Sequence, residues 1–466
     1  MQDYSHTPQD NPPFKSMKPE QQFLENLFLK LNSNCIRYAV MRNYQSLPYS
    51  TNGSDLDILV HPSDAEHART IIFNTIKQAG GVPIGYVDIP GFLKIFALGS
   101  YERDNEKILW WGLRLDISFG LYFAGAINLF EWPDEYIEMH NGVSILNATL
   151  ANILGVLKEV LNNNQLPARY IDAARKDIDK NWTNISMALA PMGGKASYLF
   201  RALLTEKIEE STIYDRCASI RKALCRHAFW QSPLAYIYRR ICFEWSKVHR
   251  YISPPGLMIA ILGVDGSGKS TIIGKIRPIL EEATHNALFI KHLRPFLFPP
   301  LARLKGKKVV FEKPVLDPHG SNPSGTLGSL LRLIYLLLDY ILGYWILIRP
   351  QIAKQPAIAL FDRYAYDIAI DPRRFRIGIS ARVACWFTKI APKPDLIFCL
   401  HAAPETIAMR KQELPIAEIQ GQLVALKAFA TNQSSAVLVS TEGCIEDARE
   451  DILKILHNYL FLKFKG

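Results

Sequence analysis

The sequence predicts an α/β protein whose C-terminal half forms a doubly wound parallel sheet, preceded by a small α+β domain and a helical connector. Four continuous apolar runs, at 257–263, 357–361, 395–400 and 436–440, alternate with helical stretches, as is typical of parallel strands buried on both faces. Short strand-type segments flank turn formers near the N-terminus. Between about 147 and 250, several helix-period segments without internal proline indicate a helical region.

The elements follow in order along the chain. Residues 36–45 and 55–60 are predicted strands around a turn, 64–79 is a predicted helix, and 113–120 is a further strand. The Ser-Pro-Pro-Gly turn at 253–256 ends the helical region and introduces the first buried strand. We therefore divide the chain into a flexible tail at 1–20, an α+β domain at 21–146, a connector at 147–252 and a parallel-sheet domain at 253–466.

The apolar stretch at 330–348 is nearly long enough to cross a bilayer. Arg332 and Asp339 lie inside it, and each charge costs roughly 2.5–3.5 kcal/mol at the centre of an inserted helix. We expect a helix of the α/β domain here. A transmembrane helix and an interfacial helix remain less favoured alternatives.

The net charge of +10 is unevenly distributed. Residues 1–140 contain 11 Lys/Arg against 17 Asp/Glu, a balance of −6, so the remaining residues carry +16. Residues 216–250 contain eight Lys/Arg and one acid, which indicates a solvated helix face or contact with an anionic partner such as nucleic acid or a membrane surface. The seven cysteines form no CxxC pair, so we expect neither a zinc site nor a disulfide framework, and a cytoplasmic location.

A phosphate-binding loop follows the first buried strand. Residues 263–270, GVDGSGKS, match GxxxxGK[ST] and precede a helical segment. Glycines let successive backbone N–H groups point at phosphate, the lysine reaches the β- and γ-phosphates, and the serine can bind Mg²⁺. The sequence therefore predicts ATP and Mg²⁺ as cofactors, with candidate residues Gly263, Gly266, Ser267, Gly268, Lys269, Ser270 and Thr271.

The run GVDGSGKST resembles the loop of thymidylate kinases, as does Asp362-Arg363-Tyr364 after the strand at 357–361. The segment 323–328, PSGTLG, with Arg332 four residues on, is similar to the acceptor-side segment of that family. The resemblance, which covers 253–466, implies that Asp265 lies near the acceptor and Asp362 near Mg²⁺. It places Arg363 and Arg332 on the acceptor or the transferred phosphate. Lys269 completes this catalytic set.

Two basic clusters fit a closing lid over the phosphates. One contains Arg373 and Arg374, and the other contains Arg410. Arginine forks pair bidentately with phosphate oxygens, although a solvated basic loop is the main alternative for either cluster. Residues 296–322 separate Arg294-Pro295 from the 323–328 segment, whereas these pieces are nearly contiguous in thymidylate kinases. The sequence therefore indicates a remodelled acceptor pocket and does not assign dTMP as the acceptor.

Three carboxylates predict a second site, near the N-terminus. Asp55 and Asp57 lie on one predicted strand, and Asp116 lies on another. The set resembles the nucleotidyltransferase fold, which implies metal binding by these residues. That family has Gly-Ser about ten residues before its acidic pair, whereas here Gly-Ser directly precedes Asp55. An active transferase, a binding-only domain and a coincidental acidic strand therefore all remain open.

The leading hypothesis is an ATP- and Mg²⁺-dependent kinase fused to a nucleotidyltransferase-like domain, a combination that resembles bacterial proteins of surface-glycan gene clusters. The expected partners are a nucleoside triphosphate and a small acceptor that bears a phosphate or hydroxyl, such as a nucleotide, sugar or sugar phosphate. Two alternatives are a nucleotide-gated switch or adaptor and a nucleic-acid end-processing kinase. Nucleic acid is the less favoured partner, peripheral membrane contact stays open, and the sequence does not define the oligomeric state.

Overall fold

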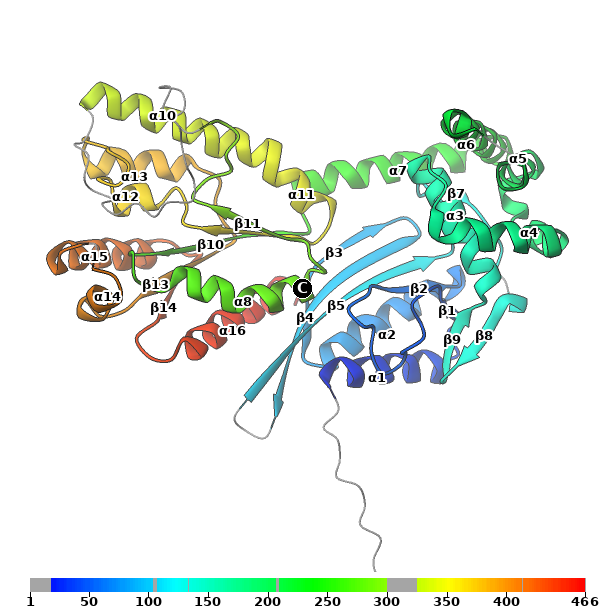
Figure 1. Cartoon of the computed structure of the whole chain (residues 1–466), viewed down its shortest axis with the longest axis horizontal. Helices are drawn as coiled ribbons and strands as arrows, with labels where there is room; N and C mark the ends of the chain where they lie inside the picture. Colours follow the sequence, from blue (N-terminus) through cyan, green and yellow to red (C-terminus); the bar gives the residue numbers. More distant parts are fainter. Residues whose placement is uncertain are drawn as a thin grey trace, which may run out of the picture.

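The computed structural model describes residues 18–103, 107–132, 134–206, 209–299, 325–412 and 414–465. Figure 1 shows two neighbouring sheets with helices around them and a further group of helices, α3 to α6, at the upper right. Most of the predicted tail at 1–20 lies outside the described residues, although its last two residues already belong to the first helix.

The N-terminal sheet has seven strands in the order β3-β4-β5-β2-β1-β9-β8. Its register places Asp57 of β2 opposite Asp116 of β5, because these two strands are parallel and neighbouring. β1 runs antiparallel to β2. The strands are β1 (Tyr38–Val40), β2 (Leu56–Val60), β3 (Gly81–Ile89), β4 (Phe92–Arg103), β5 (Lys107–Phe119), β8 (Ile137–His140) and β9 (Val143–Leu146), and the short pair β6 (Tyr122–Phe123) and β7 (Ile127–Asn128) lies apart.

Two helices cover this sheet, α1 (Pro19–Ser33) and α2 (Ala65–Gln78). Each buries one apolar stripe at helical spacing, for example Phe23, Leu24 and Leu27 of α1. These side chains share a core with the inward-facing residues of β2 and β5. Burial of this stripe supplies most of the stability of a helix of this length.

Five helices form the predicted connector, and their core also includes residues of 121–136 and, from the N-terminal sheet, Ala39, Leu59 and Leu146. They are α3 (Ala148–Asn163), α4 (Ala168–Ala188), α5 (Gly194–Thr205), α6 (Ile213–Gln231) and α7 (Pro233–Ile252). α7 differs from the others because none of its residues is buried. It runs back from this group toward the C-terminal sheet (Figure 1).

The C-terminal sheet is parallel throughout, in the order β11-β12-β10-β13-β14. This order reverses direction at β10, which is the topology of a doubly wound α/β fold, as the sequence predicts. The strands are β10 (Leu257–Gly263), β11 (Leu288–His292), β12 (Ile358–Asp362), β13 (Leu396–His401) and β14 (Ala436–Ser440). All seven residues of β10 are buried, which explains its continuous apolar sequence.

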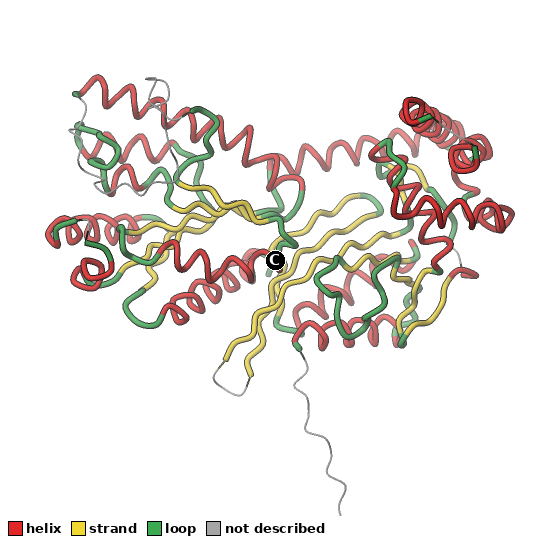
Figure 2. Tube along the Cα trace, in the orientation of Figure 1, coloured by secondary structure: helices red, strands yellow, loops and turns green. Residues whose placement is uncertain are grey.

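Helices cover both faces of the C-terminal sheet, with α8 and α16 on one side and α10 and α13 on the other (Figures 1 and 2). The predicted helix at 330–348 is confirmed as α10 and the π-helical turn Tyr344–Ile348. The helices are α8 (Lys269–Ala283), α10 (Thr326–Gly343), α11 (Arg349–Lys354), α12 (Asp367–Ile370), α13 (Ala381–Ile390), α14 (Pro404–Arg410), α15 (Ile416–Asn432) and α16 (Ile445–Lys463).

The two sheets meet through α8 and α16, which pack against β3, β4 and β5. A Cβ on Gly112 would lie 2.3 Å from the backbone of Ala283, so only glycine permits this approach of β5 to α8. The Gly112 N–H donates to Glu282 at 3.2 Å, and Trp110 Nε1 donates to Glu450 of α16 at 2.8 Å. Core residues of β3 and β4 join the core of the C-terminal sheet. The strands of the N-terminal domain therefore serve as a platform for the second domain.

Candidate functional site

The phosphate-binding loop connects β10 to α8 at the carboxyl edge of the C-terminal sheet. Gly266 and Gly268 have φ of 86° and 88°, a conformation that glycine adopts without steric cost. The loop directs the N-terminus of α8, and with it the helix dipole, toward this edge. Ser270 and Thr271 lie exposed in the first turn of α8, whereas Ser267 is buried.

Lys269 is folded back onto the loop. Its Nζ donates to the carbonyl oxygens of Gly263 and Val264 at 2.8 and 2.9 Å, and the side chain is buried. Burial, together with the nearby charge of Arg363, lowers the pKa of Lys269 to about 7. An arriving phosphate would therefore replace carbonyl partners and favour the protonated amine.

Asp265 accepts hydrogen bonds from two arginines, Arg363 and Arg374, and lies 3.9 Å from Lys269 Nζ. Burial by itself would raise the pKa of Asp265, but the charges of Arg363, Lys269 and Arg374 outweigh it and lower the pKa to about 2. Three of the predicted phosphate-binding cations are thus gathered around one carboxylate.

The backbone of Arg363 has a φ of 72°, a left-handed conformation that costs energy for a residue with a side chain. The residue follows β12, and its guanidinium also lies 3.7 Å from buried Asp367. Asp367 was not predicted from the sequence. It accepts from the Tyr364 N–H at 3.0 Å, so it fixes the turn that directs Arg363 toward the loop.

Asp362 ends β12, directly beside β10. Its Oδ2 lies 3.2 Å from His292 Nδ1, which ends β11. Burial opposes ionisation, but the hydrogen bond of His292 and the charges of Lys269 and Arg363 lower the pKa of Asp362. Among the described residues, no hydrogen-bond partner reaches the buried Oδ1 of Asp362 or the Oγ of Ser267. These oxygens are available to a ligand at the sheet edge.

Arg332 lies apart from the loop cluster, on α10. Its Nη1 donates to the carbonyl oxygen of Phe375 at 3.3 Å, and burial lowers its pKa. In the same area, the Ser329 hydroxyl accepts from the Gly378 N–H at 2.9 Å. Arg332 therefore joins α10 to the segment that carries Arg373 and Arg374. The prediction that Arg332 contacts phosphate stays a prediction, and Pro323 and Ser324 of the acceptor-side segment lie outside the described residues.

The two predicted lid clusters differ in their surroundings. Arg374 reaches Asp265, but Arg373 is exposed and pairs with Glu418 of α15 at 2.8 Å. Arg410 donates to the carbonyl oxygen of Thr441 at 2.7 Å, and the Thr441 hydroxyl donates to the carbonyl oxygen of Ser267 at 3.0 Å. Arg410 is thus connected to the phosphate-binding loop through Thr441.

An open cavity of about 680 Å³ lies next to this loop, between the ends of β13 and β14 and helices α14 and α15. Its lining includes His401, Leu423, Val424 and Glu442. The mixed apolar and polar character and the place at the carboxyl ends of two strands suit a ligand of nucleoside size.

The structure also brings the three predicted N-terminal carboxylates together. Ligand oxygens of Asp55, Asp57 and Asp116 all lie within 4.8 Å of one another. Asp57 is buried, which raises its pKa even though Arg42 opposes the rise. The parallel pairing of β2 and β5 is the reason that residues 59 positions apart converge.

Four cations that the sequence argument did not identify surround these carboxylates. Arg42 donates to Asp57 and, at 2.9 Å, to Asp55. Arg114 lies 2.6 Å from Asp116, and Lys94 lies 3.7 Å from it. Burial lowers the pKa of Lys94 and of Lys158, which faces Asp57. Lys94 of β4 is the register partner of Asp116 of β5, and Arg114 lies two residues before Asp116 on the same strand, so only the strand register reveals this cluster.

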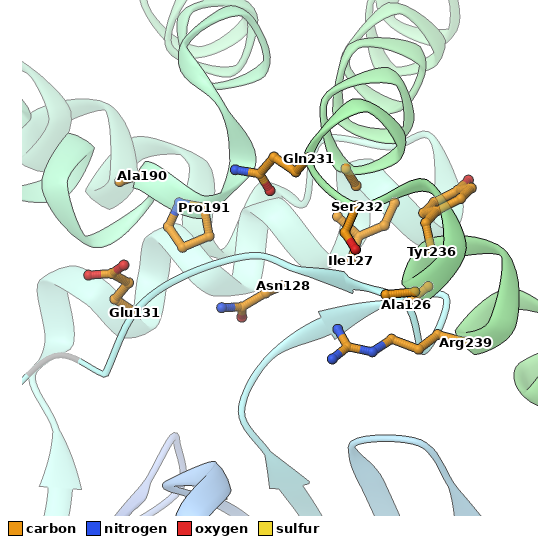
Figure 3. Close-up of a pocket in the computed structure, with 12 residues that line it drawn as sticks. Ala126, Ile127, Asn128, Glu131, Ala190, Pro191, Gln231, Ser232, Tyr236 and Arg239 are labelled. Atoms are coloured by element: carbon orange, nitrogen blue, oxygen red, sulfur yellow. The ribbon is translucent and has the colours of Figure 1, made fainter.

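A further polar cavity, of about 360 Å³, lies between β7 and helices α6 and α7. Figure 3 shows the side chains of Asn128, Gln231 and Arg239 around it. None of the predicted site residues lines this cavity.

Comparisons with known proteins find a similarity to thymidylate kinases over less than half of the chain. The chain is 27% identical over 213 residues to the probable thymidylate kinase of Archaeoglobus fulgidus. The aligned region covers 44% of this chain and 98% of that protein. It is 29% identical over 161 residues to the thymidylate kinase of Xanthomonas campestris pv. campestris, which covers 33% of this chain and 60% of that protein. No family model matches the chain.

Among solved structures, the alignment with a thymidylate kinase from Ehrlichia chaffeensis covers 43% of this chain and 100% of the kinase, with a TM-score of 0.30 and 16% identity. A thymidylate kinase from Candida albicans covers 44% of this chain and 92% of its own, with a TM-score of 0.33 and 18% identity.

Proposed function

About 44% of the chain is a thymidylate kinase-like domain, and from this premise we propose that the protein is an ATP- and Mg²⁺-dependent phosphotransferase. The observation that carries the proposal is the meeting of Lys269, Asp265, Arg363 and Arg374 at the carboxyl edge of a parallel sheet. Phosphoryl transfer needs positioned cations that absorb charge on the transferred group, and little covalent chemistry from the protein. We place the reaction in the cytoplasm.

In the proposed reaction an acceptor oxygen attacks the γ-phosphorus of ATP, the bond to the β–γ bridging oxygen breaks, and ADP leaves. The N–H groups of the loop and the N-terminus of α8 bind the β-phosphate, and Lys269 leaves its carbonyl partners to neutralise phosphate charge. Arg363, held by Asp265 and Asp367, offers its guanidinium to the transferred group.

The residues present fit a magnesium ion, because Asp362 has a free buried oxygen and Ser270 has an exposed hydroxyl at the helix start. Oxygen ligands of this kind are those that Mg²⁺ prefers. When bound, the ion would neutralise phosphate charge.

The proposed acceptor is a nucleotide, a sugar or a sugar phosphate. Arg332 and the segment at 371–380 border the proposed acceptor side, and this segment is tied to α10 by the Ser329 hydrogen bond. Because residues 296–322 replace a nearly contiguous connection in the family that the sequence resembles, we do not restrict the acceptor to dTMP.

For the N-terminal domain we propose a nucleotidyltransferase-like site at Asp55, Asp57 and Asp116. The convergence of three carboxylates on neighbouring strands supports metal binding, and the surrounding arginines supply partners for triphosphate. The same arginines support the alternative of a binding-only domain, because Arg42 and Arg114 already neutralise the carboxylates.

A nucleotide-gated switch is the second candidate function, and one observation favours it. α8 starts at the phosphate-binding loop and its last turn contacts β5, the strand of Asp116. A shift of α8 on nucleotide binding would therefore reach the N-terminal site.

The test is a screen of nucleoside monophosphates, sugars and sugar phosphates with γ-labelled ATP, with mass analysis of the product. We expect one acceptor class to be phosphorylated by the full chain and Lys269→Ala to abolish transfer. Lys275→Ala is the matched control, since Lys275 lies on the same helix but is half exposed and pairs with Glu446. Undiminished transfer by folded Lys269→Ala would overturn the assignment, and ATP binding without any transfer would favour the switch.

A further inference from the structure

α10 packs into the core of the C-terminal sheet, although Thr326–Lys354 is long and apolar enough to cross a membrane. Leu333, Leu336 and Tyr340 on its inner side join the core of the parallel sheet. Asp339, fully buried, lies 3.1 Å from buried Arg294 and accepts from the Phe298 N–H. This buried ion pair would be exposed to lipid if the helix left the domain to insert.

The outer side of α10 is nevertheless apolar. Only 33% of its most hydrophobic window is buried. Leu331, Ile334, Leu338 and Trp345 recur at intervals of three, four and seven residues, and their exposed fractions range from 40% to 59%. An exposed apolar stripe of this length on a helix marks a contact surface.

The neighbouring helix α13 combines apolar and basic side chains on its exposed side. Arg382, Trp386 and Lys389 are spaced three and four residues apart and are all exposed. Trp386 exposes 60% of its surface. Between Asp371 and Asp395 the sequence contains six Lys/Arg and no acidic residue. α10 and α13 contact each other and lie on the same side of the C-terminal sheet (Figure 1).

α7 extends this surface. Its exposed residues Tyr238, Ile241, Trp245 and Val248 again recur at intervals of three and four, and none of its residues is buried. Tyr251 of α7 contacts the π-helical turn Tyr344–Ile348 that follows α10. The ring centroid of Tyr251 lies 5.9 Å from that of Trp345, and the Tyr251 hydroxyl donates to the Trp345 carbonyl at 2.8 Å. Figure 1 shows α10, α11 and α7 in one row along the upper edge of the molecule.

We propose that this α7–α10–α13 surface, defined by the exposed residues named above, docks on the surface of a membrane that contains anionic lipid. Tryptophan and tyrosine favour the boundary between acyl chains and headgroups, and the apolar stripes of α10 and α7 enter that boundary to a shallow depth. Arg382 and Lys389 sit beside Trp386, where anionic headgroups would meet them.

Charge complementarity favours lipid over a second copy of the chain. A two-fold interface on this surface would bring the exposed Arg382 and Lys389 of two α13 helices into proximity, with no acidic residue on α13 to offset them. An anionic bilayer offers the opposite charge over the whole surface.

The test is flotation of the full chain with two kinds of vesicle, pure phosphatidylcholine and phosphatidylcholine with 30% phosphatidylglycerol. We expect the partition coefficient for the anionic vesicles to be at least tenfold higher than that for the neutral ones. Arg382→Gln with Lys389→Gln should lower the partition coefficient about thirty-fold, because each cation near such a surface contributes about 1 kcal/mol. Ile334→Glu with Trp386→Glu should abolish binding.

Met139→Glu is the matched control, since Met139 is 64% exposed on β8, away from this surface, and should leave binding unchanged. Circular dichroism of each variant checks its fold. Absence of wild-type binding to anionic vesicles, or full binding by the Ile334→Glu/Trp386→Glu variant, would overturn the proposal. So would sedimentation that shows a dimer in the wild type and a monomer in that variant, because the surface would then belong to a second copy.

Discussion

Replacement of Asp265 by asparagine separates two roles of the phosphate-binding loop. The carboxylate neutralises Arg363, Arg374 and Lys269, and this lowers its pKa from an ordinary value of 3.8 to about 2. A depressed carboxyl pKa stabilises the fold above pH 4, and the contribution disappears as the pH falls through 2. The fall in pKa corresponds to about 2 kcal/mol, and with 13% exposure of the side chain solvent screening reduces this only slightly.

We therefore expect Asp265→Asn to lower the free energy of unfolding by about 2 kcal/mol at pH 7 in urea titrations, with the difference vanishing near pH 2. Affinity for ATP should move in the opposite direction and rise about tenfold, since three cations lose their anion. Asp88→Asn is the control, because Asp88, which pairs with Arg69, is 43% exposed, and loss of a pair with an exposed carboxylate should change stability by less than about 1 kcal/mol. Loss of both stability and ATP affinity would refute the reasoning.

Three further outcomes are expected. Arg363→Ala should lower kcat at least a hundredfold and change the Kd of ATP less than threefold, and an equal loss in both would place Arg363 at the donor site. Binding of ATP should be accompanied by uptake of about half a proton at pH 7, since phosphate raises the depressed pKa of Lys269, and the affinity for ATP should fall as the pH rises from 7 to 9. Calorimetry in two buffers of different ionisation enthalpy measures the proton uptake, which Lys269→Met should remove. Mn²⁺ should raise the melting temperature of the nucleotide-free full chain, and Asp57→Asn should cancel that increase. The same variant should lose any pyrophosphate release and keep the kinase reaction. Stabilisation by Mn²⁺ that survives Asp57→Asn would contradict the N-terminal metal site.

Residues close together in sequence were the most predictable part of the candidate site. The GxxxxGK[ST] spacing identifies the loop because its chemistry resides in consecutive backbone groups, and Asp362-Arg363 follows a strand whose apolar run is visible. His292, Asp367 and Thr441 could not be predicted, because tertiary packing brings them to the site from the end of β11, the start of α12 and the residue after β14. Nothing in their local sequence distinguishes them from ordinary polar residues.

The same limit applies to the N-terminal domain. Strands β3 and β4 were not predicted, although together with β5 they form the platform for α8 and α16. The apolar residues of β4 serve two cores, one on each face, so the alternation of polar and apolar residues that marks a half-buried strand is weak there. Arg42, Lys94, Arg114 and Lys158 became visible only through the register of the sheet and the packing of α3.

α8 gives the two candidate sites a physical connection. Its N-terminus carries Lys269, and its last turn is fixed to β5 by the hydrogen bond between Glu282 and the Gly112 N–H and by the close contact of Ala283 with Gly112. The 15-residue helix is about 22 Å long and has Pro278 in its interior, which removes one backbone hydrogen bond, so movement at the loop would reach β5 through a single helix. β5 carries Arg114 and Asp116. His285 lies just beyond the end of α8, and its pKa is lowered by burial and by the charge of Arg114 and raised by that of Asp116, with a net lowering. Nucleotide occupancy at one site and the ion pairs at the other therefore bear on the same helix, which makes thermodynamic coupling between them reciprocal.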